Sequence, residues 1–297
     1  LRKGFVATQT ATALSRLDSA GAIDLGRLQM AEFAMSPTGF NGHYGHAVNP
    51  WNKAHVPGGS SSGSGVAVAS ACIPAALGSD TGGSIRLPAA MCGITGIKAT
   101  ATRVSVAGVM PLSWTLDCIG PLARSAHDCA RLLTVLAGAD EADGYCSTQA
   151  VPDYETGLDG DLRGLRIAHV GAYYEAKLDP AVADCLARAR RVFEERGAVF
   201  VQTGVNNMDL INALSHVVMT VEAATLHRQW LTESPEQYAE QVRGRMEPGL
   251  YYPATRYAEA LCLREKLTRQ WLADAMQDCD LAFLPLMPCP VPLIAET

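Results

Sequence analysis

The chain has 297 residues, 48% of them hydrophobic and 18% charged, and this balance excludes an intrinsically disordered protein because enough apolar surface is present to form a core. The 24 lysines and arginines against 30 aspartates and glutamates give a net charge of −6, which argues against a nucleic-acid-binding face. No stretch approaches the roughly 18 consecutive apolar residues of a membrane span, and the first four residues lack the apolar core of a signal peptide. We therefore expect a cytoplasmic protein without nucleic acid or membrane partners.

The N-terminal half of the chain predicts alternating helices and strands. Apolar spacing and capping residues predict helices over residues 11–21, 30–35, 64–72 and 125–137, the last one capped by Ser125. Short apolar runs predict strands over residues 22–25, 75–78, 94–98 and 103–106. Residues 36–65 form a long polar segment, and an irregular segment of this length inside a domain is usually functional.

The C-terminal half predicts one β-α-β unit with parallel strands. The strands are expected at residues 165–170 and 198–201, and the helix between them begins at Asp179-Pro180 and ends at Arg196-Gly197. Residues 208–278 are mostly helical in pattern, and residues 281–284 form a further apolar strand. Residues 139–161, rich in Asp, Gly, Glu and Thr, form a connector. We expect a single α/β domain over residues 1–297, with a mixed β-sheet flanked by helices and active-site loops at the strand ends.

The cysteine and histidine patterns do not predict a metal centre. The nine cysteines are scattered, odd in number and without a C-x-x-C pair, so we expect reduced and mostly buried thiols. His43, His46 and His55 lie in the polar segment before the serine run. A metal site there is an open alternative, but loop residues near the mouth of a pocket are the favoured interpretation.

Two Gly/Ser loops, residues 58–65 and 81–84, carry the strongest chemical signal. Composition alone would allow the first loop to be a flexible linker, but a small-residue helix follows it directly, and a strand then leads into the second loop. Glycine allows backbone N–H groups to point into a shared pocket, where they can stabilise an oxyanion. A phosphate-binding loop is excluded because neither loop contains the lysine that such a motif requires. The Gly-x-Ser-x-Gly letters at residues 59–63 lack the apolar strand that leads into a nucleophile elbow.

This region resembles the amidase signature family of serine hydrolases. The match runs through Gly58-Gly59-Ser60-Ser61-Ser62-Gly63, Gly78-x-Asp80 and Gly82-Gly83-Ser84-Ile85-Arg86-x-Pro88. The signature core covers residues 57–125 and includes Gly120-Pro121-Leu122-Ala123-Arg124-Ser125. Further similarities precede it at Glu32-Phe33-Ala34-Met35 and Asn49-Pro50-Trp51. The resemblance implies an amidase-signature-like α/β fold and an enzyme without a cofactor. It would hydrolyse a small-molecule carboxamide to a carboxylate and ammonia.

The resemblance also implies roles for individual residues. Ser84 matches the nucleophile that forms the acyl-enzyme, and Ser60 matches a bridging serine whose peptide bond from Gly59 is expected to be cis. The backbone N–H groups of a four-residue loop are expected to form the oxyanion hole: Thr81, Gly82, Gly83 and Ser84. Asp80 and Arg86 are expected to hold this loop, and Ser61 and Ser62 to make structural hydrogen bonds.

The family's lysine base has no clear counterpart in this chain. Lys3 and Lys53 are the only lysines before Ser60, neither has the family's context, and Lys98 matches a strand lysine instead. We therefore expect an amidase chain that lacks its catalytic lysine and is truncated at both ends. Two other functions stay open: the glutaminase component of a tRNA-dependent amidotransferase, and a non-catalytic scaffold with a degenerate site. A homodimer also stays open.

Overall fold

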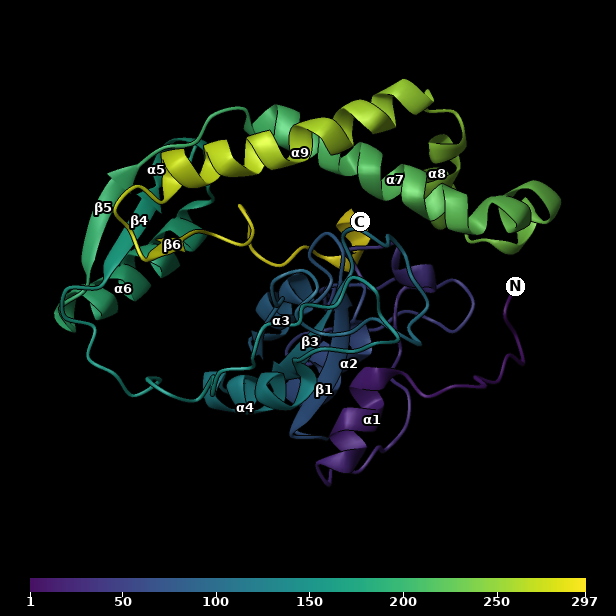
Figure 1. Cartoon of the computed structure of the whole chain (residues 1–297), viewed down its shortest axis with the longest axis horizontal. Coiled ribbons are helices and arrows are strands. Elements are labelled where there is room, and N and C mark those ends of the chain that lie inside the picture. The colour runs from purple at the N-terminus through teal and green to yellow at the C-terminus, as the bar shows by residue number, and fades with distance from the viewer. The chain divides into compact units, whose positions relative to one another are not determined.

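The computed structural model describes residues 1–297 and divides them into two compact units (Figure 1). The first unit contains Leu1–Leu158, Met219–Tyr251 and Leu293–Thr297, and the second contains Asp159–Val218 and Tyr252–Pro292. The sequence patterns predicted one domain. The first boundary between the units, after Leu158, falls inside the connector predicted over residues 139–161.

The first unit is built on a three-stranded antiparallel sheet in the order β1-β3-β2. Its strands are β1 (Ala75–Asp80), β2 (Thr95–Gly96) and β3 (Cys118–Ala123). All six residues of β3 are buried because this strand lies between the other two. The register pairs Asp80, the last residue of β1, with Cys118, the first residue of β3.

Helices pack on this sheet and leave the ends of β1 and β3 to the connecting loops. In chain order they are α1 (Thr12–Ser19), α2 (Ser62–Ala69), α3 (Arg86–Cys92) and α4 (Ala126–Leu136). Helix α2 packs on β1 and α3, and α4 packs on β3 (Figure 1). The Ser125 hydroxyl accepts a hydrogen bond from the Asp128 N–H, which confirms the predicted N-cap of α4.

The first unit also holds a helical segment that follows residue 218. Helix α7 (Met208–Glu233) begins in the second unit, and its residues from Met219 onward belong to the first. The remaining helical elements of the first unit are η1 (Glu32–Ala34), η2 (Pro235–Gln237), α8 (Glu240–Met246), η3 (Glu247–Leu250) and η4 (Ile294–Glu296). One apolar cluster joins α7 and α8 to the residues around η1, including Met35, Leu231 and Met246.

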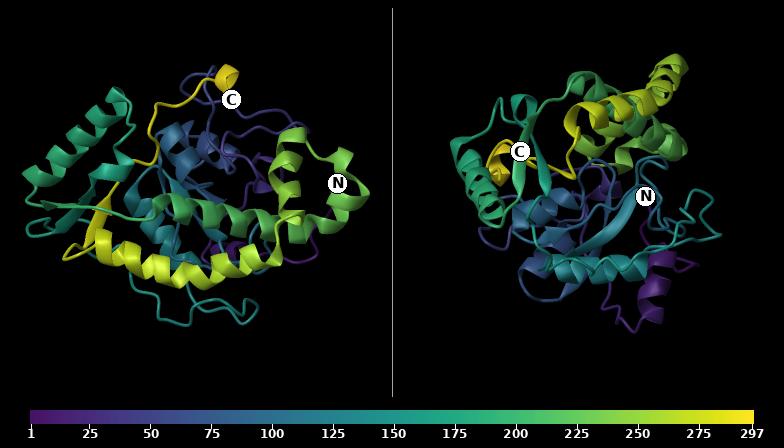
Figure 2. Two further views of the ribbon diagram at one scale, coloured as in Figure 1. Left: turned by 90° about the horizontal axis from the view of Figure 1, so that it is seen from above. Right: turned by 60° about the vertical axis from the view of Figure 1, so that its left-hand side comes forward.

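The second unit is built on a three-stranded parallel sheet in the order β5-β4-β6. Its strands are β4 (Arg166–Val170), β5 (Val199–Thr203) and β6 (Leu281–Phe283), and its helices include α5 (Gly171–Tyr174), α6 (Pro180–Glu195) and α9 (Ala254–Ala275). Helix α6 packs against β5 (Figure 2). The parallel pairing of β4 with β5 confirms the predicted β-α-β unit.

The α/β class and the flanking helices are confirmed, whereas several local predictions are wrong. The predicted β-structure is divided between two three-stranded sheets, one antiparallel and one parallel. Residues 22–25 form no strand, and Ile23 and Leu25 stay 83% and 77% exposed, because no neighbouring strand pairs with them. Residues 103–106 contribute only an isolated bridge from Val104 to Ala137. Helix α3 and strand β3 were not predicted.

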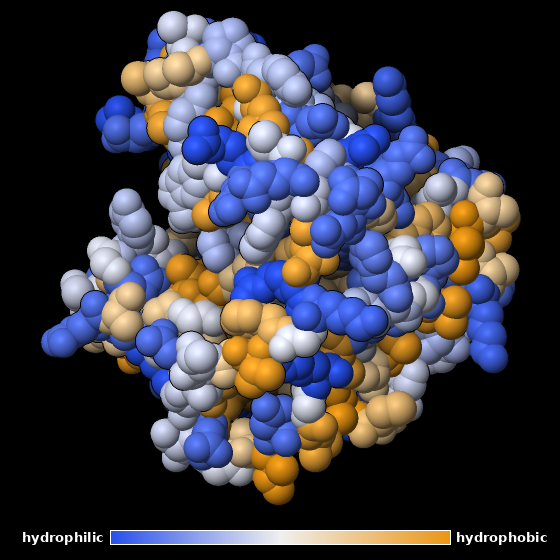
Figure 3. All heavy atoms as spheres, turned by 90° about the vertical axis from the view of Figure 1, so that its right-hand side faces the viewer, coloured by the Kyte–Doolittle hydropathy of each residue, from blue (hydrophilic) through white to orange (hydrophobic).

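Exposed apolar side chains such as Ile23 and Leu25 lie on the surface among polar groups. Large apolar residues are also exposed near the N-terminus, where Phe5 and Val6 are 57% and 79% exposed. The face drawn in Figure 3 accordingly shows hydrophobic and hydrophilic groups interspersed. None of the helices is both long enough and apolar enough to span a bilayer.

Candidate active site

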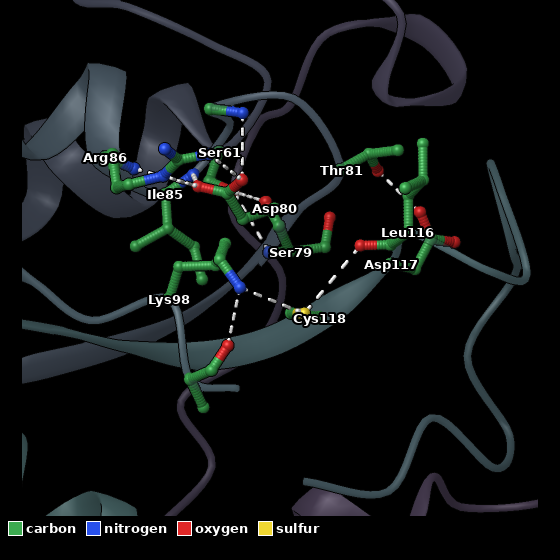
Figure 4. Close-up of polar contacts among 12 residues, drawn as sticks. Ser61, Ser79, Asp80, Thr81, Ile85, Arg86, Lys98, Leu116, Asp117 and Cys118 are labelled. Carbon is green, nitrogen blue, oxygen red and sulfur yellow. Dashed lines mark hydrogen bonds and ion pairs between the residues drawn. The ribbon is translucent and has the colours of Figure 1, made fainter. Parts of the chain in front are cut away.

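The segment that carries the two Gly/Ser loops is held together from inside by the carboxylate of Asp80. This side chain is fully buried at the end of β1. It accepts hydrogen bonds from the N–H groups of Gly83 (2.8 Å), Ile85 (3.1 Å) and Arg86 (3.3 Å). It also accepts two from the Arg86 guanidinium, at 3.0 and 2.8 Å (Figure 4). This geometry matches the expectation that Asp80 and Arg86 hold the loop.

The electrostatics of Asp80 follow from the same contacts. Burial raises the pKa of a carboxyl group, but here the hydrogen bonds and the charge of Arg86 outweigh burial and lower the pKa of Asp80 below its ordinary value. The backbone amides of Ile85 and Arg86 act in the same direction. Asp80 is therefore a fixed negative charge that orders the backbone of residues 83–86.

Glycine is required at several positions of the first loop because the backbone passes close to other segments. A Cβ atom at Gly59 would lie 2.4 Å from the Ser36 carbonyl oxygen. One at Gly58, whose φ is +83°, would lie 2.8 Å from the backbone of Pro88. The loop is therefore packed between two parts of the chain, which rules out the flexible linker.

Ser60 lies in the interior of this loop with an unusual environment. The Gly59–Ser60 peptide bond is cis, as expected. The Ser60 side chain is fully buried, and its Oγ has no hydrogen-bond partner. Buried hydroxyl groups are nearly always hydrogen-bonded, because leaving one unsatisfied costs free energy. The Ser60 hydroxyl is thus a polar group in the protein interior, and no other group of the chain forms a hydrogen bond with its Oγ.

The neighbouring serines have structural partners. Ser61 Oγ contacts the backbone of Ser79, Ser62 Oγ donates to the Ser60 carbonyl at 3.3 Å, and Ser64 Oγ donates to the Leu77 carbonyl at 2.7 Å. The structural role expected for Ser61 and Ser62 agrees with these bonds.

The structure joins the loop of Ser60 to the loop of Ser84 through the backbone. The Ser61 N–H donates to the Ser84 carbonyl oxygen at 3.2 Å, so the residue after Ser60 touches Ser84 directly. Ser84 itself is partly exposed, and Gly82 is exposed. The two hydroxyl-bearing residues 24 positions apart in sequence are therefore brought into adjacent segments.

The predicted oxyanion donors have different environments. The Gly83 N–H already donates to Asp80, so this amide has a partner within the protein. Gly82 is exposed, and a Cβ there would meet the Met219 Sδ at an ordinary contact distance of 3.8 Å. Thr81 donates its hydroxyl to the carboxylate of Asp117.

Two acidic residues that no sequence pattern indicated, the partly buried Asp117 and the buried Glu222, lie near this loop. Asp117 accepts from Thr81, and Glu222 is fully buried and accepts from Ser113 and Thr115. Thr81 lies 36 residues before Asp117, and the partners of Glu222 lie more than 100 residues before it, so no local spacing could have revealed these contacts.

Lys98 lies near the site but is already engaged. Its Nζ donates to the Ala99 carbonyl oxygen at 2.6 Å and contacts the Cys118 Sγ at 3.6 Å (Figure 4). Burial raises the pKa of the Cys118 thiol, and the nearby Lys98 only partly opposes this effect. These contacts suit a structural lysine, in line with the sequence interpretation.

The other cysteines and the loop histidines show no ligand cluster. All nine cysteines are free, but only Cys92, Cys118 and Cys129 are buried, so the prediction of mostly buried thiols is wrong. His43 pairs with Glu32 at 3.0 Å, and the His46 Nδ1 accepts from the Asn41 N–H. No group of three or more His, Cys, Asp or Glu residues is arranged to hold a metal ion in residues 1–297.

Comparison with known proteins places these features in a family. The family model described as Amidase matches residues 1–297, and the chain therefore belongs to the Amidase family. A glutamyl-tRNA(Gln) amidotransferase subunit from Methylococcus capsulatus is 37% identical over 96% of this chain and 63% of its own length.

Solved structures show the same fold. A crystal structure of an amidase superimposes with a TM-score of 0.85 at 31% identity, covering 98% of this chain and 63% of that one. A vestigial protein complex, described as revealing the evolutionary origins of an s-triazine catabolic enzyme, gives a TM-score of 0.90 at 33% identity over 96% of this chain and 61% of that one. The chain thus spans somewhat less than two thirds of the length of these relatives.

Proposed function

We propose that this chain carries the serine-bearing part of an amidase that hydrolyses a carboxamide to a carboxylate and ammonia. The observation that carries the proposal is the Ser60 hydroxyl, which is fully buried and unpartnered next to the loop of Ser84. Leaving a buried hydroxyl unsatisfied costs free energy, and a catalytic role such as relaying a proton would account for a serine at this position. Membership of the Amidase family supports the same chemistry.

In the proposed mechanism Ser84 is the nucleophile. A serine hydroxyl is a weak nucleophile and needs a base to remove its proton. Ser60 accepts this proton as Ser84 Oγ attacks the amide carbonyl, and Ser60 passes its own proton to a basic group. The proton then returns through Ser60 to the leaving nitrogen, the C–N bond breaks, and ammonia departs. Water attacks the acyl-Ser84 ester, which releases the carboxylate and restores the serine.

The oxyanion of the tetrahedral intermediate needs hydrogen-bond donors that face the reacting carbonyl. We assign this role to the backbone amides of Thr81, Gly82 and Ser84, since Gly82 is exposed and Thr81 and Ser84 are partly exposed, so a substrate can reach this loop. The Gly83 amide instead helps to hold the loop through Asp80. The family resemblance implies a lysine as the final base, and we assign no lysine of this chain to that role.

Labelling with a fluorophosphonate probe tests the proposal in the full-length protein. We expect covalent labelling at Ser84 and ammonia release from simple carboxamides, both abolished by Ser84→Ala. Ser60→Ala should slow labelling severely, because the proton relay is lost. Ser70→Ala, which removes an exposed hydroxyl at the end of α2, serves as the matched control and should behave like the unmodified protein. Normal ammonia release by Ser84→Ala would refute the assignment.

A second candidate function is the glutaminase component of an amidotransferase. The curated relative from Methylococcus capsulatus carries the name of an amidotransferase subunit, and this supports the alternative. A protein of this kind should release ammonia from glutamine in preference to other carboxamides, and only with a partner protein bound. Efficient hydrolysis of small amides by the isolated protein would favour the free-standing amidase. A full-length protein that neither reacts with the probe nor releases ammonia would favour the non-catalytic scaffold. The cytoplasmic location and the homodimer stay predictions.

A further inference from the structure

The loop of residues 112–117, which leads into β3, is fixed by two carboxylates, the buried Glu222 and the partly buried Asp117. Glu222 on α7 accepts hydrogen bonds from the Ser113 hydroxyl, the Thr115 N–H (3.1 Å) and the Thr115 hydroxyl (2.8 Å). Asp117, at the other end of the loop, accepts from the N–H groups of Leu112 (2.8 Å) and Ser113 (3.1 Å). The loop is thus held at several points and is a rigid support.

One oxygen of Asp117 is directed away from its own loop, toward the candidate active site. Asp117 Oδ2 binds the two amides of residues 112 and 113, whereas Oδ1 accepts the hydrogen bond from the Thr81 hydroxyl (Figure 4). Burial raises the pKa of Asp117, and the hydrogen bonds from Thr81 and the two amides oppose this effect. The carboxylate is therefore committed to three donors, only one of which lies outside its own loop.

Thr81 is the first residue after β1 and opens the loop that ends at Ser84. Asp80 holds this loop through the amides of Gly83, Ile85 and Arg86. None of these contacts restrains the plane of the peptide group between Thr81 and Gly82. The Thr81 side chain, bound to Asp117, is the contact that limits rotation at this position.

We infer that Asp117 is a positioning residue that holds Thr81 by its hydroxyl and thereby directs the amides of Thr81 and Gly82 toward the substrate carbonyl. This inference rests on the proposed function, because it concerns the oxyanion donors assigned there. Hydrogen bonds to an oxyanion form fully only in the transition state, so the placement of these amides affects the chemical step more than substrate binding. The hydroxyl of Thr81 therefore acts on catalysis through geometry, without touching the substrate.

The test compares Thr81→Val, which keeps the shape of the side chain and removes its hydroxyl, with Thr81→Ser, which keeps the hydroxyl. Asp117→Asn is a third variant, because an amide group cannot accept from all three donors at once. Thr232→Val is the matched control, since its hydroxyl bonds only to the Arg228 carbonyl on exposed helix surface. All variants are made in the full-length protein.

Two measurements are made on each variant. For Thr81→Val we expect kcat for amide hydrolysis to fall about tenfold to a hundredfold, with KM within about twofold, as a misplaced catalytic group produces. We also expect backbone amides in residues 81–84 to exchange with deuterium about tenfold faster, since one restraint on the loop is lost. Thr81→Ser should restore both quantities, Asp117→Asn should resemble Thr81→Val, and Thr232→Val should match the unmodified protein.

The two measurements separate failure of this inference from failure of the proposed function. If the unmodified protein releases no ammonia, the proposed function fails, while the exchange data still decide whether Asp117 and Thr81 restrain the loop. Exchange in Thr81→Val equal to that of the unmodified protein would overturn the inference. A loop that exchanges faster in an enzyme whose kcat is unchanged would overturn it as well.

Discussion

The signature segment of the first unit and the β-α-β unit of the second obtain their structures by different means. In residues 57–92 three polar side chains are fully buried, namely Ser60, Ser62 and Asp80, and glycines lie where backbones approach each other closely. In the β-α-β unit none of the 16 residues of α6 is buried, and the helix begins at an Asp cap followed by Pro180. The first region therefore depends on contacts between distant residues, and the second depends mainly on local signals.

Because the first unit depends on close contacts between distant backbone segments, we expect the largest loss of stability when a side chain is added between two of them. A Cβ at Gly120, in the middle of β3, would lie 2.1 Å from the Ile97 carbonyl oxygen. Because backbone cannot move aside as a flexible side chain can, we expect Gly120→Ala to lower the free energy of unfolding by about 3 kcal/mol or more. Urea titration measures this change.

Gly204→Ala is the matched control for that variant. No atom lies within 4 Å of the position of its Cβ, so we expect a change within about 0.5 kcal/mol. If Gly120→Ala changed the free energy of unfolding as little as this control, β3 would not lie as close to residue 97 as the structure shows.

We expect a smaller loss of stability when the positive charge of Arg86, which pairs with Asp80, is removed. Arg86→Met leaves the buried carboxylate with its backbone donors only, and we expect a loss of about 2 kcal/mol near neutral pH. This is below the cost of breaking a fully buried pair, because 40% of the Arg86 side chain is exposed and solvent screens the interaction.

The pH dependence of this loss follows from the pKa of Asp80. Because the folded protein lowers that pKa below 3.8, the charged carboxylate stabilises the fold above this pH, and the contribution is lost as the pH falls through the lowered value. In Arg86→Met the two lowering effects of the guanidinium are lost, so we expect burial to outweigh the remaining backbone hydrogen bonds and to raise the pKa of Asp80. The difference in stability between variant and unmodified protein should therefore narrow as the pH falls from 7 toward 3.

Arg131→Met is the control for the charge effect, because Arg131 pairs with Glu155 at the surface with 71% of its side chain exposed. We expect its unfolding curve to match that of the unmodified protein at each pH. A pH-independent difference for Arg86→Met would show that Asp80 does not depend on this arginine for its charge.

We expect the smallest loss of stability when a helix cap of the second unit is removed. The Asp179 side chain accepts a hydrogen bond from the Ala181 N–H at 2.8 Å and caps α6. Asp179→Ala should lower the free energy of unfolding by about 1 kcal/mol, the usual value of an N-cap. Asp184→Ala, at an exposed position inside the same helix, should cause no loss, since alanine is the better helix former. If the two variants changed the free energy of unfolding equally, the Asp179 cap would not stabilise α6.

The elements that sequence patterns did not predict show where local reasoning ends. Strand β3 was not predicted because Gly120 and Pro121 interrupt its apolar run, and both residues usually weaken a strand. In the folded protein the Pro121 carbonyl accepts from the Ile97 N–H, and Gly120 allows the close approach of residue 97. Conversely, residues 22–25 have the composition of a strand but no neighbour with which to pair.

The sequence by itself determined the α/β class, the ends of α4 and α6, the parallel β-α-β unit and, through its motifs, the family. These features depend on periodicity, caps and short motifs, which act over a few residues. Only the tertiary structure decided the division into two sheets, the isolation of the Ser60 hydroxyl, and the link from Thr81 through Asp117 to the loop anchored by Glu222. These features depend on burial and on hydrogen bonds between residues that are tens to hundreds of positions apart, and such partners become neighbours only when the chain folds.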